Sequence, residues 1–80
     1  SAPMKLLVFN VHTANGRHAE VRSFIERENA DLVVLMETNQ AWAESLRSLD
    51  TRYRVISALR EDNFGIMFLS RLPVISARVV

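Results

Sequence analysis

The period of the apolar residues changes along this chain and divides it into elements. Residues 4–11 (MKLLVFNV) and 31–37 (DLVVLME) each hold an almost continuous apolar run of strand length, which predicts strands buried on both faces. Between these runs, apolar residues recur at helical spacing among charged ones, so we expect a helix over residues 17–29. The chain therefore opens as a strand, a helix and a second strand.

The remaining sequence predicts one more helix and three more strands. Thr38 or Asn39 is a suitable N-cap, and Trp42, Leu46 and Leu49 form an apolar stripe at helical spacing behind it. Runs rich in apolar and β-branched residues then predict strands at residues 53–57, 64–70 and 74–80. The expected order is β-α-β-α-β-β-β, an α/β (α+β) chain.

Two polar residues stand where the first two strands end. A right-handed βαβ crossover makes these strands parallel, so Asn10 and Glu37 should lie at the same edge of the sheet. That edge is where open α/β sheets bind ligands. Alternation places Asn10 on one face with Val8, and Glu37 on one face with Leu35. Periodicity allows these two faces to coincide but does not establish it.

An amide oxygen beside a carboxylate is half of an all-oxygen metal site. Such a site suits Mg²⁺ or Mn²⁺, which accepts one or two protein ligands and completes its shell with water or phosphate oxygen. The alternative interpretation is structural: Asn10 caps a turn, while Glu37 pairs with an arginine or caps the next helix. The spacing of the residues leaves both interpretations open.

Composition excludes several classes of protein. The chain has 80 residues and no cysteine, which rules out a disulfide framework and a cysteine zinc site. Ten basic and nine acidic residues give a net charge of +1, without the basic excess typical of nucleic-acid binding. The apolar runs are too short to span a membrane. Residues 1–3 (SAP) are interpreted as a tag remnant or a linker.

Three segments, in this order, resemble the endonuclease/exonuclease/phosphatase superfamily, which has the fold of DNase I and exonuclease III. They are LLVFNVH, DLVVLMET and DNFGIMFLSRLPV, and Met36 stands where the family usually has glutamine. The resemblance implies that residues 4–80 are the N-terminal portion of a DNase I-like four-layer α/β sandwich. It also implies that Glu37 binds Mg²⁺ (or Mn²⁺) directly, and that Asn10 binds the ion, its water or a phosphate oxygen.

The activity implied by this resemblance is divalent-metal-dependent hydrolysis of a phosphodiester or phosphomonoester. Members act on nucleic acid, phospholipid head groups or inositol phosphates, and this chain is most similar to bacterial members often found behind membrane anchors. A cytoplasmic and a membrane-anchored protein both fit this resemblance. The later catalytic groups of the family, including its general base and histidine, have no counterpart here, so we expect an N-terminal fragment that is inactive alone.

The sequence also supports a second hypothesis, a non-catalytic interaction module. Two helices can cover one face of the sheet only, and the strand at residues 64–70 is apolar on both sides. We therefore expect an exposed apolar sheet face. The missing C-terminal part of the domain, a second copy or another partner would cover it.

The other polar and aromatic candidates have plain structural interpretations. His12 is expected in a loop without a role, His18 beside the core, and Trp42 in the core. Arg71 matches a family motif, and its role is taken as structural. Residues 62–63 are placed either near a substrate rim or in an ordinary turn.

Overall fold

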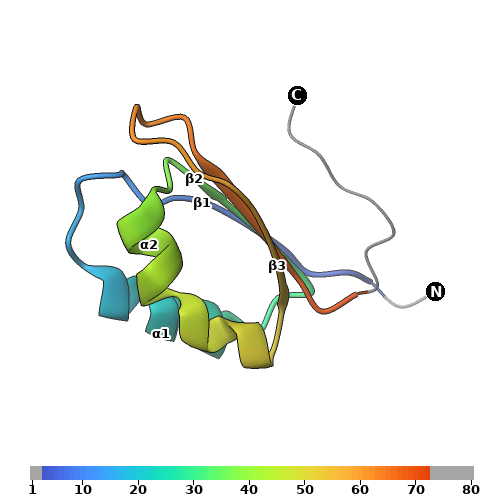
Figure 1. Cartoon of the computed structure of the whole chain (residues 1–80). Coiled ribbons are helices and arrows are strands. Elements are labelled where there is room, and N and C mark those ends of the chain that lie inside the picture. The colour runs from blue at the N-terminus through green and yellow to red at the C-terminus, as the bar shows by residue number, and fades with distance from the viewer. Residues whose placement is uncertain (1–2, 73–80) are drawn as a thin grey trace.

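The computed structural model describes residues 3–72. The elements are β1 (Leu6–Asn10), α1 (His18–Glu28), β2 (Leu32–Met36), α2 (Gln40–Ser45), the 3-10 helix η1 (Arg47–Thr51), β3 (Arg54–Ala58) and β4 (Ile66–Ser70) (Figure 1). This order confirms the predicted α/β class over the described residues. The strand expected at residues 74–80 lies outside them, as do the first two residues of the expected tag or linker.

The strands form one sheet in the order β1-β2-β4-β3. β1 and β2 are parallel neighbours, as predicted, and β4 is antiparallel to both β2 and β3. The parallel register pairs Asn10 with Met36, the last residues of their strands. The carboxyl ends of β1 and β2 therefore meet at one edge of the sheet.

Each α-helix has an asparagine at one end. Asn39 accepts a hydrogen bond at its side chain from the Trp42 backbone N–H (3.0 Å), which confirms the expected N-cap of α2. Asn29 ends α1 in the left-handed conformation (φ 50°), and its N–H donates to the Ile25 carbonyl. The second predicted helix divides at Leu46: α2 is α-helical, and η1 continues the apolar stripe as a 3-10 helix.

The helices cover one face of the sheet, and the core lies between them and that face (Figure 1). Alternate strand residues point to the helices, so the inward positions of β2 and β4 are buried. The buried core consists of Val11, Val21, Ile25, Ala30, Val33, Leu35, Trp42, Leu46, Leu49, Tyr53, Met67 and Leu69. Trp42 is fully buried, as expected. None of the helices within residues 3–72 is long and apolar enough to span a membrane.

The opposite face of the sheet carries a second apolar surface, and no described helix covers it (Figure 1). The strand register aligns one row of side chains across all four strands: Val8, Val34, Phe68 and Ile56. Val8 is 52% exposed, and Leu6 beside it is 53% exposed. The expected exposed apolar face is thus present in the described part of the chain.

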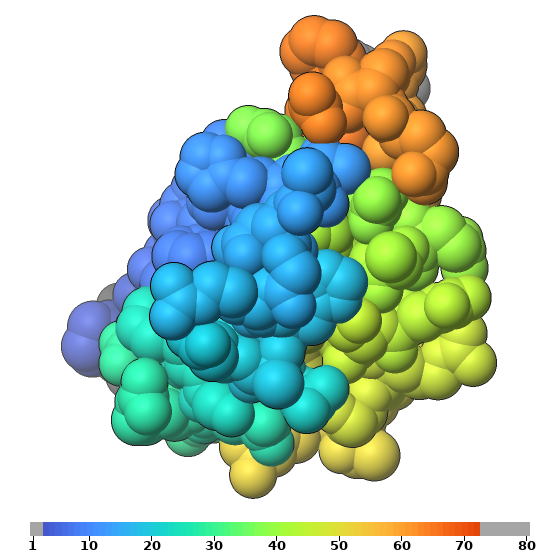
Figure 2. Space-filling model, turned by 90° about the vertical axis from the view of Figure 1, so that its left-hand side faces the viewer, coloured from blue at the N-terminus to red at the C-terminus, as the bar shows by residue number. Residues whose placement is uncertain are grey.

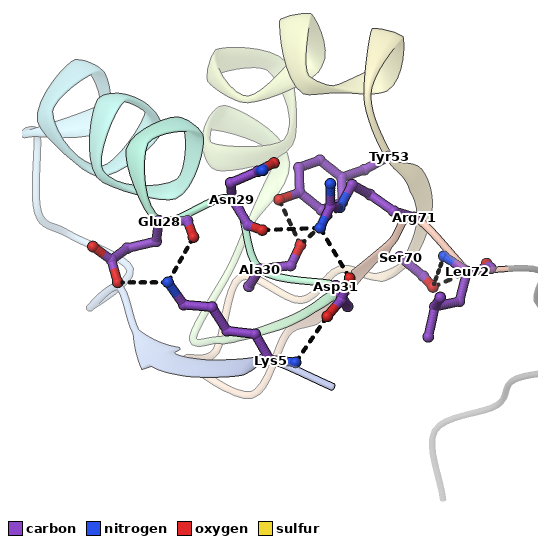
Figure 3. Close-up of polar contacts among 9 residues, drawn as sticks. All are labelled: Lys5, Glu28, Asn29, Ala30, Asp31, Tyr53, Ser70, Arg71 and Leu72. Carbon is purple, nitrogen blue, oxygen red and sulfur yellow. Dashed lines mark hydrogen bonds and ion pairs between the residues drawn. The ribbon is translucent and has the colours of Figure 1, made fainter. Parts of the chain in front are cut away.

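A polar cluster around Arg71 lies at the end of the sheet where β2 begins and β4 ends (Figure 3). The Arg71 guanidinium donates to the carbonyl oxygens of Asn29 (3.0 Å) and Ala30 (3.2 Å) and to Asp31 Oδ1 (2.9 Å). The Tyr53 hydroxyl donates to the same Ala30 carbonyl (2.9 Å). Arg71 therefore joins the end of β4 to the connection between α1 and β2, which is the structural role expected of it.

Replacing Arg71 by alanine should lower the free energy of unfolding by about 1–2 kcal/mol, because two carbonyls and one carboxylate lose a charged donor. Arg71→Lys should recover only part of this loss, since one ammonium cannot reproduce the planar fork of donors. Urea unfolding of the full-length protein measures both effects. Equal stability of Arg71→Ala and the parent protein would contradict the assigned role.

Candidate functional site

Asn10 and Glu37 meet at the carboxyl edge of β1 and β2. The Asn10 Nδ2 group donates a hydrogen bond to Glu37 Oε2, and the contact is partly buried. The two residues are 27 positions apart in the chain and come together because their parallel strands are neighbours. The sequence placed these two residues at one edge and left open whether their side chains meet; in the structure they do.

The contact does not come from strand alternation, however. Asn10 pairs with Met36, so Asn10 faces the uncovered side of the sheet, whereas Val33 and Leu35 face the helices. Continued alternation would place Glu37 with Val33 and Leu35. Instead Glu37 adopts a left-handed backbone (φ 63°), which ends β2 at Met36 and redirects the side chain to Asn10. The two predicted faces do not match, and a turn brings the side chains together.

Neighbouring segments hold this turn in place. The Thr13 hydroxyl donates to the Glu37 carbonyl (2.7 Å), and the Thr38 N–H donates to the Gly65 carbonyl (3.0 Å). A non-glycine residue with positive φ is costly and persists where the surrounding structure enforces it, often at functional sites. The backbone turn at Glu37 is therefore held by contacts on both sides.

Gly65 allows one of these contacts. A Cβ atom added at Gly65 would lie 1.8 Å from the Thr38 carbonyl oxygen and 2.9 Å from the Arg60 nitrogen. Only glycine permits so close an approach of two backbones. The apolar run predicted a strand over residues 64–70 that includes Gly65, whereas β4 begins at Ile66. A lone glycine next to a strand is the signal that was available.

The Asn10 amide is engaged at both ends. Its Oδ1 accepts a hydrogen bond from the His12 backbone N–H (2.9 Å), and its Nδ2 faces Glu37. His12 has a left-handed backbone (φ 58°), which completes this local turn. Within residues 3–72, no hydrogen bond uses Glu37 Oε1. Through its Nδ2 group, Asn10 thus orients the Glu37 carboxylate.

A groove of about 280 Å³ begins at this pair. It is lined by Asn10, Met36, Glu37, Asn63, Phe64, Gly65 and Ile66. Of the two turn residues expected near the rim, Asn63 lines the groove, whereas Asp62 pairs with Arg60. The hydrogen bond from Arg60 lowers the pKa of the Asp62 carboxyl below its usual range, and the same contact raises the pKa of Arg60.

The donor atoms at this edge fit a hard divalent cation, but they do not enclose one. A carboxylate and an amide are oxygen donors of the type that Mg²⁺ accepts, and Mg²⁺ needs only one or two of them from protein. No group of three or more histidine, cysteine, aspartate or glutamate residues gathers at one point within residues 3–72. Further ligands would be water, phosphate oxygen or residues outside this range.

The remaining candidates lie away from the groove. The His18 ring packs on Trp42, with ring centroids 3.9 Å apart, and hydrogen-bonds Ser45 Oγ, as expected for a histidine at the border of the core. The Arg22 guanidinium donates to the Ser45 carbonyl (2.9 Å) and so joins α1 to the end of α2. Trp42 donates through Nε1 to the Thr13 carbonyl (3.3 Å), which braces the loop before α1.

Two examples represent the solved structures that are similar to this chain. One is truncated TDP2 of Caenorhabditis elegans and the other is TDP2 of C. elegans; each has a TM-score of 0.72, 15% identity and 84% coverage of this chain. The chain spans 29% of the first and 22% of the second, so the likeness shows the fold, a DNase I-like one, over a minor part of each. No curated protein sequence matches the chain.

The model of the Endonuclease/Exonuclease/phosphatase family matches residues 7–80. The match begins within β1, includes β2, and contains both Asn10 and Glu37. It also includes Gly65 and Arg71, in the segment whose resemblance to this family the sequence already indicated. The chain therefore belongs to the Endonuclease/Exonuclease/phosphatase family.

Proposed function

We propose that this chain is part of a divalent-metal-dependent phosphoester hydrolase. One observation carries the proposal: a left-handed turn and the Asn10 amide direct the Glu37 carboxylate into a groove at the ligand-binding edge of the sheet. A backbone held in a costly conformation to present one carboxylate is typical of a functional site. Membership of the Endonuclease/Exonuclease/phosphatase family favours phosphoester chemistry there.

Glu37 is the residue that would hold Mg²⁺ or Mn²⁺. When bound, such an ion neutralises phosphate oxygens and stabilises the negative charge that develops during hydrolysis. Asn10 fixes the rotamer of the carboxylate through its Nδ2 group, and the His12 N–H fixes Asn10 in turn. Direct coordination by Asn10, which the resemblance implies, remains a prediction, since its Oδ1 is occupied by His12 in this arrangement.

The other catalytic groups belong, in this proposal, to residues beyond 3–72. A general base must lie within hydrogen-bond reach of the attacking water. The described groove offers Glu37 as its only carboxylate, and this residue is assigned to the ion. The chain spans less than a third of each similar structure, which is consistent with a longer hydrolase.

Hydrolysis of bis-p-nitrophenyl phosphate by the full-length protein tests this function. We expect release of p-nitrophenolate with Mg²⁺ or Mn²⁺, and its loss on addition of EDTA followed by recovery with excess metal. Nucleic acid, a phospholipid and an inositol phosphate are then compared as natural substrates. Metal-independent turnover, or no turnover of any of these four substrates, would contradict the proposal.

Replacing Asn10 by alanine should weaken metal binding or activity by about 10–100-fold, the usual cost of removing a residue that orients a metal ligand. Higher metal concentration should restore part of the activity, because the Glu37 carboxylate is still present. Titration with Mn²⁺ and assays over a range of Mg²⁺ concentrations measure this effect. Unchanged metal affinity and unchanged turnover would rule out an orienting role.

The uncovered sheet face supports a second candidate function, a non-catalytic interaction module. Val8 is more than half exposed and belongs to an apolar row that continues across the sheet, and Leu6 beside it is exposed to a similar degree. Such a module would associate through this face without binding divalent ions. Sedimentation of the full-length protein over a concentration series, with Val8→Lys as the disrupting variant, tests it. Stoichiometric Mn²⁺ binding that requires Glu37 would favour the hydrolase instead.

A further inference from the structure

The connection between β1 and α1, residues 11–17, lies against α2 (Figure 1). Figure 2 shows the blue surface of this connection next to the green surface of α2. Trp42 of α2 donates through Nε1 to the Thr13 carbonyl (3.3 Å), and the Thr13 hydroxyl donates to the Glu37 carbonyl (2.7 Å). Thr13 therefore contacts both α2 and the turn that carries the candidate metal ligand.

The Glu37 carbonyl takes its donor from a side chain. The Val11 N–H donates to the Met36 carbonyl (3.0 Å), one residue before Glu37. The left-handed backbone at Glu37 (φ 63°) then ends β2, so the next carbonyl leaves the ladder between the strands. Within residues 3–72 it accepts from the Thr13 hydroxyl and from no backbone N–H. Because an unpaired carbonyl shielded from water is costly, this hydroxyl stabilises one conformation of the turn.

The contacts of Thr13 form a closed ring. α2 begins three residues after Glu37. Trp42 in this helix is fully buried, and its ring also packs on His18 of α1, with ring centroids 3.9 Å apart. The indole N–H therefore has a fixed position. The chain runs from Glu37 into α2 and returns to Glu37 by way of Trp42 and Thr13.

The same connection also holds the other member of the pair. The His12 N–H donates to Asn10 Oδ1 (2.9 Å), and Thr13 is the next residue. The Asn15 N–H donates to the His12 carbonyl (2.8 Å), which closes this segment into a turn. Two consecutive residues thus bind the Asn10 amide and the Glu37 backbone, so their spacing relates the two sides of the site.

We propose that Thr13 is a positioning residue, whose hydroxyl sets the place of the Glu37 carboxylate through the Glu37 backbone. The inference rests on the proposed function, since it takes the divalent ion to be bound at Glu37. Thr13 does not line the groove, so it acts through Glu37 and not on the ligand. Without the hydroxyl, a smaller fraction of molecules has the binding conformation of the turn, and the metal affinity falls with that fraction.

The test separates the Thr13 hydroxyl from the shape of the side chain. Thr13→Val removes the donor, and Thr13→Ser keeps it. Thr51→Val is the matched control, because the Thr51 hydroxyl also donates to a backbone carbonyl, that of Ser48 (3.1 Å), but lies in η1 and outside the groove. Calorimetric titration of the full-length protein with Mn²⁺ should give a dissociation constant about 10-fold higher in Thr13→Val, the lower end of the cost of losing support for a metal ligand. Thr13→Ser and Thr51→Val should stay within about 2-fold of the parent.

Amide hydrogen exchange of the metal-free protein gives a second readout. The Thr38 N–H, which donates to the Gly65 carbonyl (3.0 Å), reports on the turn, and the Arg71 N–H, which donates to the Asp31 carbonyl (3.0 Å), reports on the opposite end of the sheet. Thr13→Val should speed exchange at Thr38 about 5-fold, the usual effect of one hydrogen bond, and leave exchange at Arg71 unchanged. Equal acceleration of both amides would show a general loss of stability and would overturn the inference.

Two binding results would also overturn it: Thr13→Val that binds Mn²⁺ as tightly as the parent, or Thr13→Ser that binds it as weakly as Thr13→Val. Failure of the proposed function gives a different result, because the parent protein itself then binds no Mn²⁺. In that case, selective acceleration at Thr38 still supports Thr13 as the residue that positions the turn, and unchanged exchange rejects it.

Discussion

Glu37→Gln should reduce metal-dependent phosphoester hydrolysis by about 10³-fold or more, which corresponds to about 4 kcal/mol of transition-state stabilisation. Glutamine keeps the size and the hydrogen-bonding capacity of the side chain but removes the negative charge that holds the cation. Because Glu37 is the only carboxylate of the groove, no described neighbour can replace it. Rates with bis-p-nitrophenyl phosphate and Mn²⁺ titration of the same samples measure the loss.

Glu20→Gln is the matched control for this change. Glu20 is an exposed acid on α1 whose carboxylate pairs with Arg17 (2.7 Å), and it does not line the groove that begins at Asn10 and Glu37. Its replacement should leave both activity and metal affinity within about 2-fold, since exposed pairs of this kind contribute little. Near-normal turnover of Glu37→Gln, together with unchanged Mn²⁺ binding, would refute the assignment of Glu37 to the metal.

The backbone of Glu37 allows a further comparison. Its left-handed conformation costs on the order of 1 kcal/mol for a residue with a Cβ atom, and glycine removes most of this cost. Glu37→Gly should therefore lose activity without losing stability. Stability that increases while activity disappears is the expected sign of a residue kept for function.

The sequence was sufficient to predict β1, α1, β2 and the edge of the sheet at which Asn10 and Glu37 lie. Two apolar runs predicted β1 and β2, and the crossover rule made them parallel, which placed Asn10 and Glu37 at one edge. Alternation could not predict how the side chains meet, because the left-handed turn at Glu37 depends on contacts from Thr13 and Gly65. Such contacts join segments that are distant in sequence, and no local pattern encodes them.

The same limit applies to the β3–β4 hairpin. The apolar run at residues 64–70 is continuous in the sequence, and nothing in its periodicity separates Phe64 from the strand. In the structure, Gly65 docks on the Thr38 backbone, and β4 begins one residue later. Phe64 is therefore exposed at a groove instead of buried in a sheet. Hydrophobicity predicted an apolar side chain here, and only the docking of the hairpin determines its surroundings.

Gly65→Ala should destabilise the protein by about 3 kcal/mol, at the upper end of the cost of overpacking. The added methyl would lie 1.8 Å from the Thr38 carbonyl oxygen and 2.9 Å from the Thr38 carbonyl carbon. Both are backbone atoms, which cannot rotate away as a side chain does. Relief requires the hairpin to move from Thr38, and this movement breaks the hydrogen bond from the Thr38 N–H to the Gly65 carbonyl.

The same movement should disturb the site, because Thr38 follows Glu37 directly. We expect Gly65→Ala to lower Mn²⁺ affinity as well as the urea midpoint. Gly16→Ala is the control: no atom lies within 4 Å of a Cβ there, and its φ is not positive. That variant should be neutral or more stable by up to about 1 kcal/mol, since alanine restricts the unfolded chain. Equal behaviour of the two variants would show that the close approach at Gly65 supports neither the turn nor the carboxylate at Glu37.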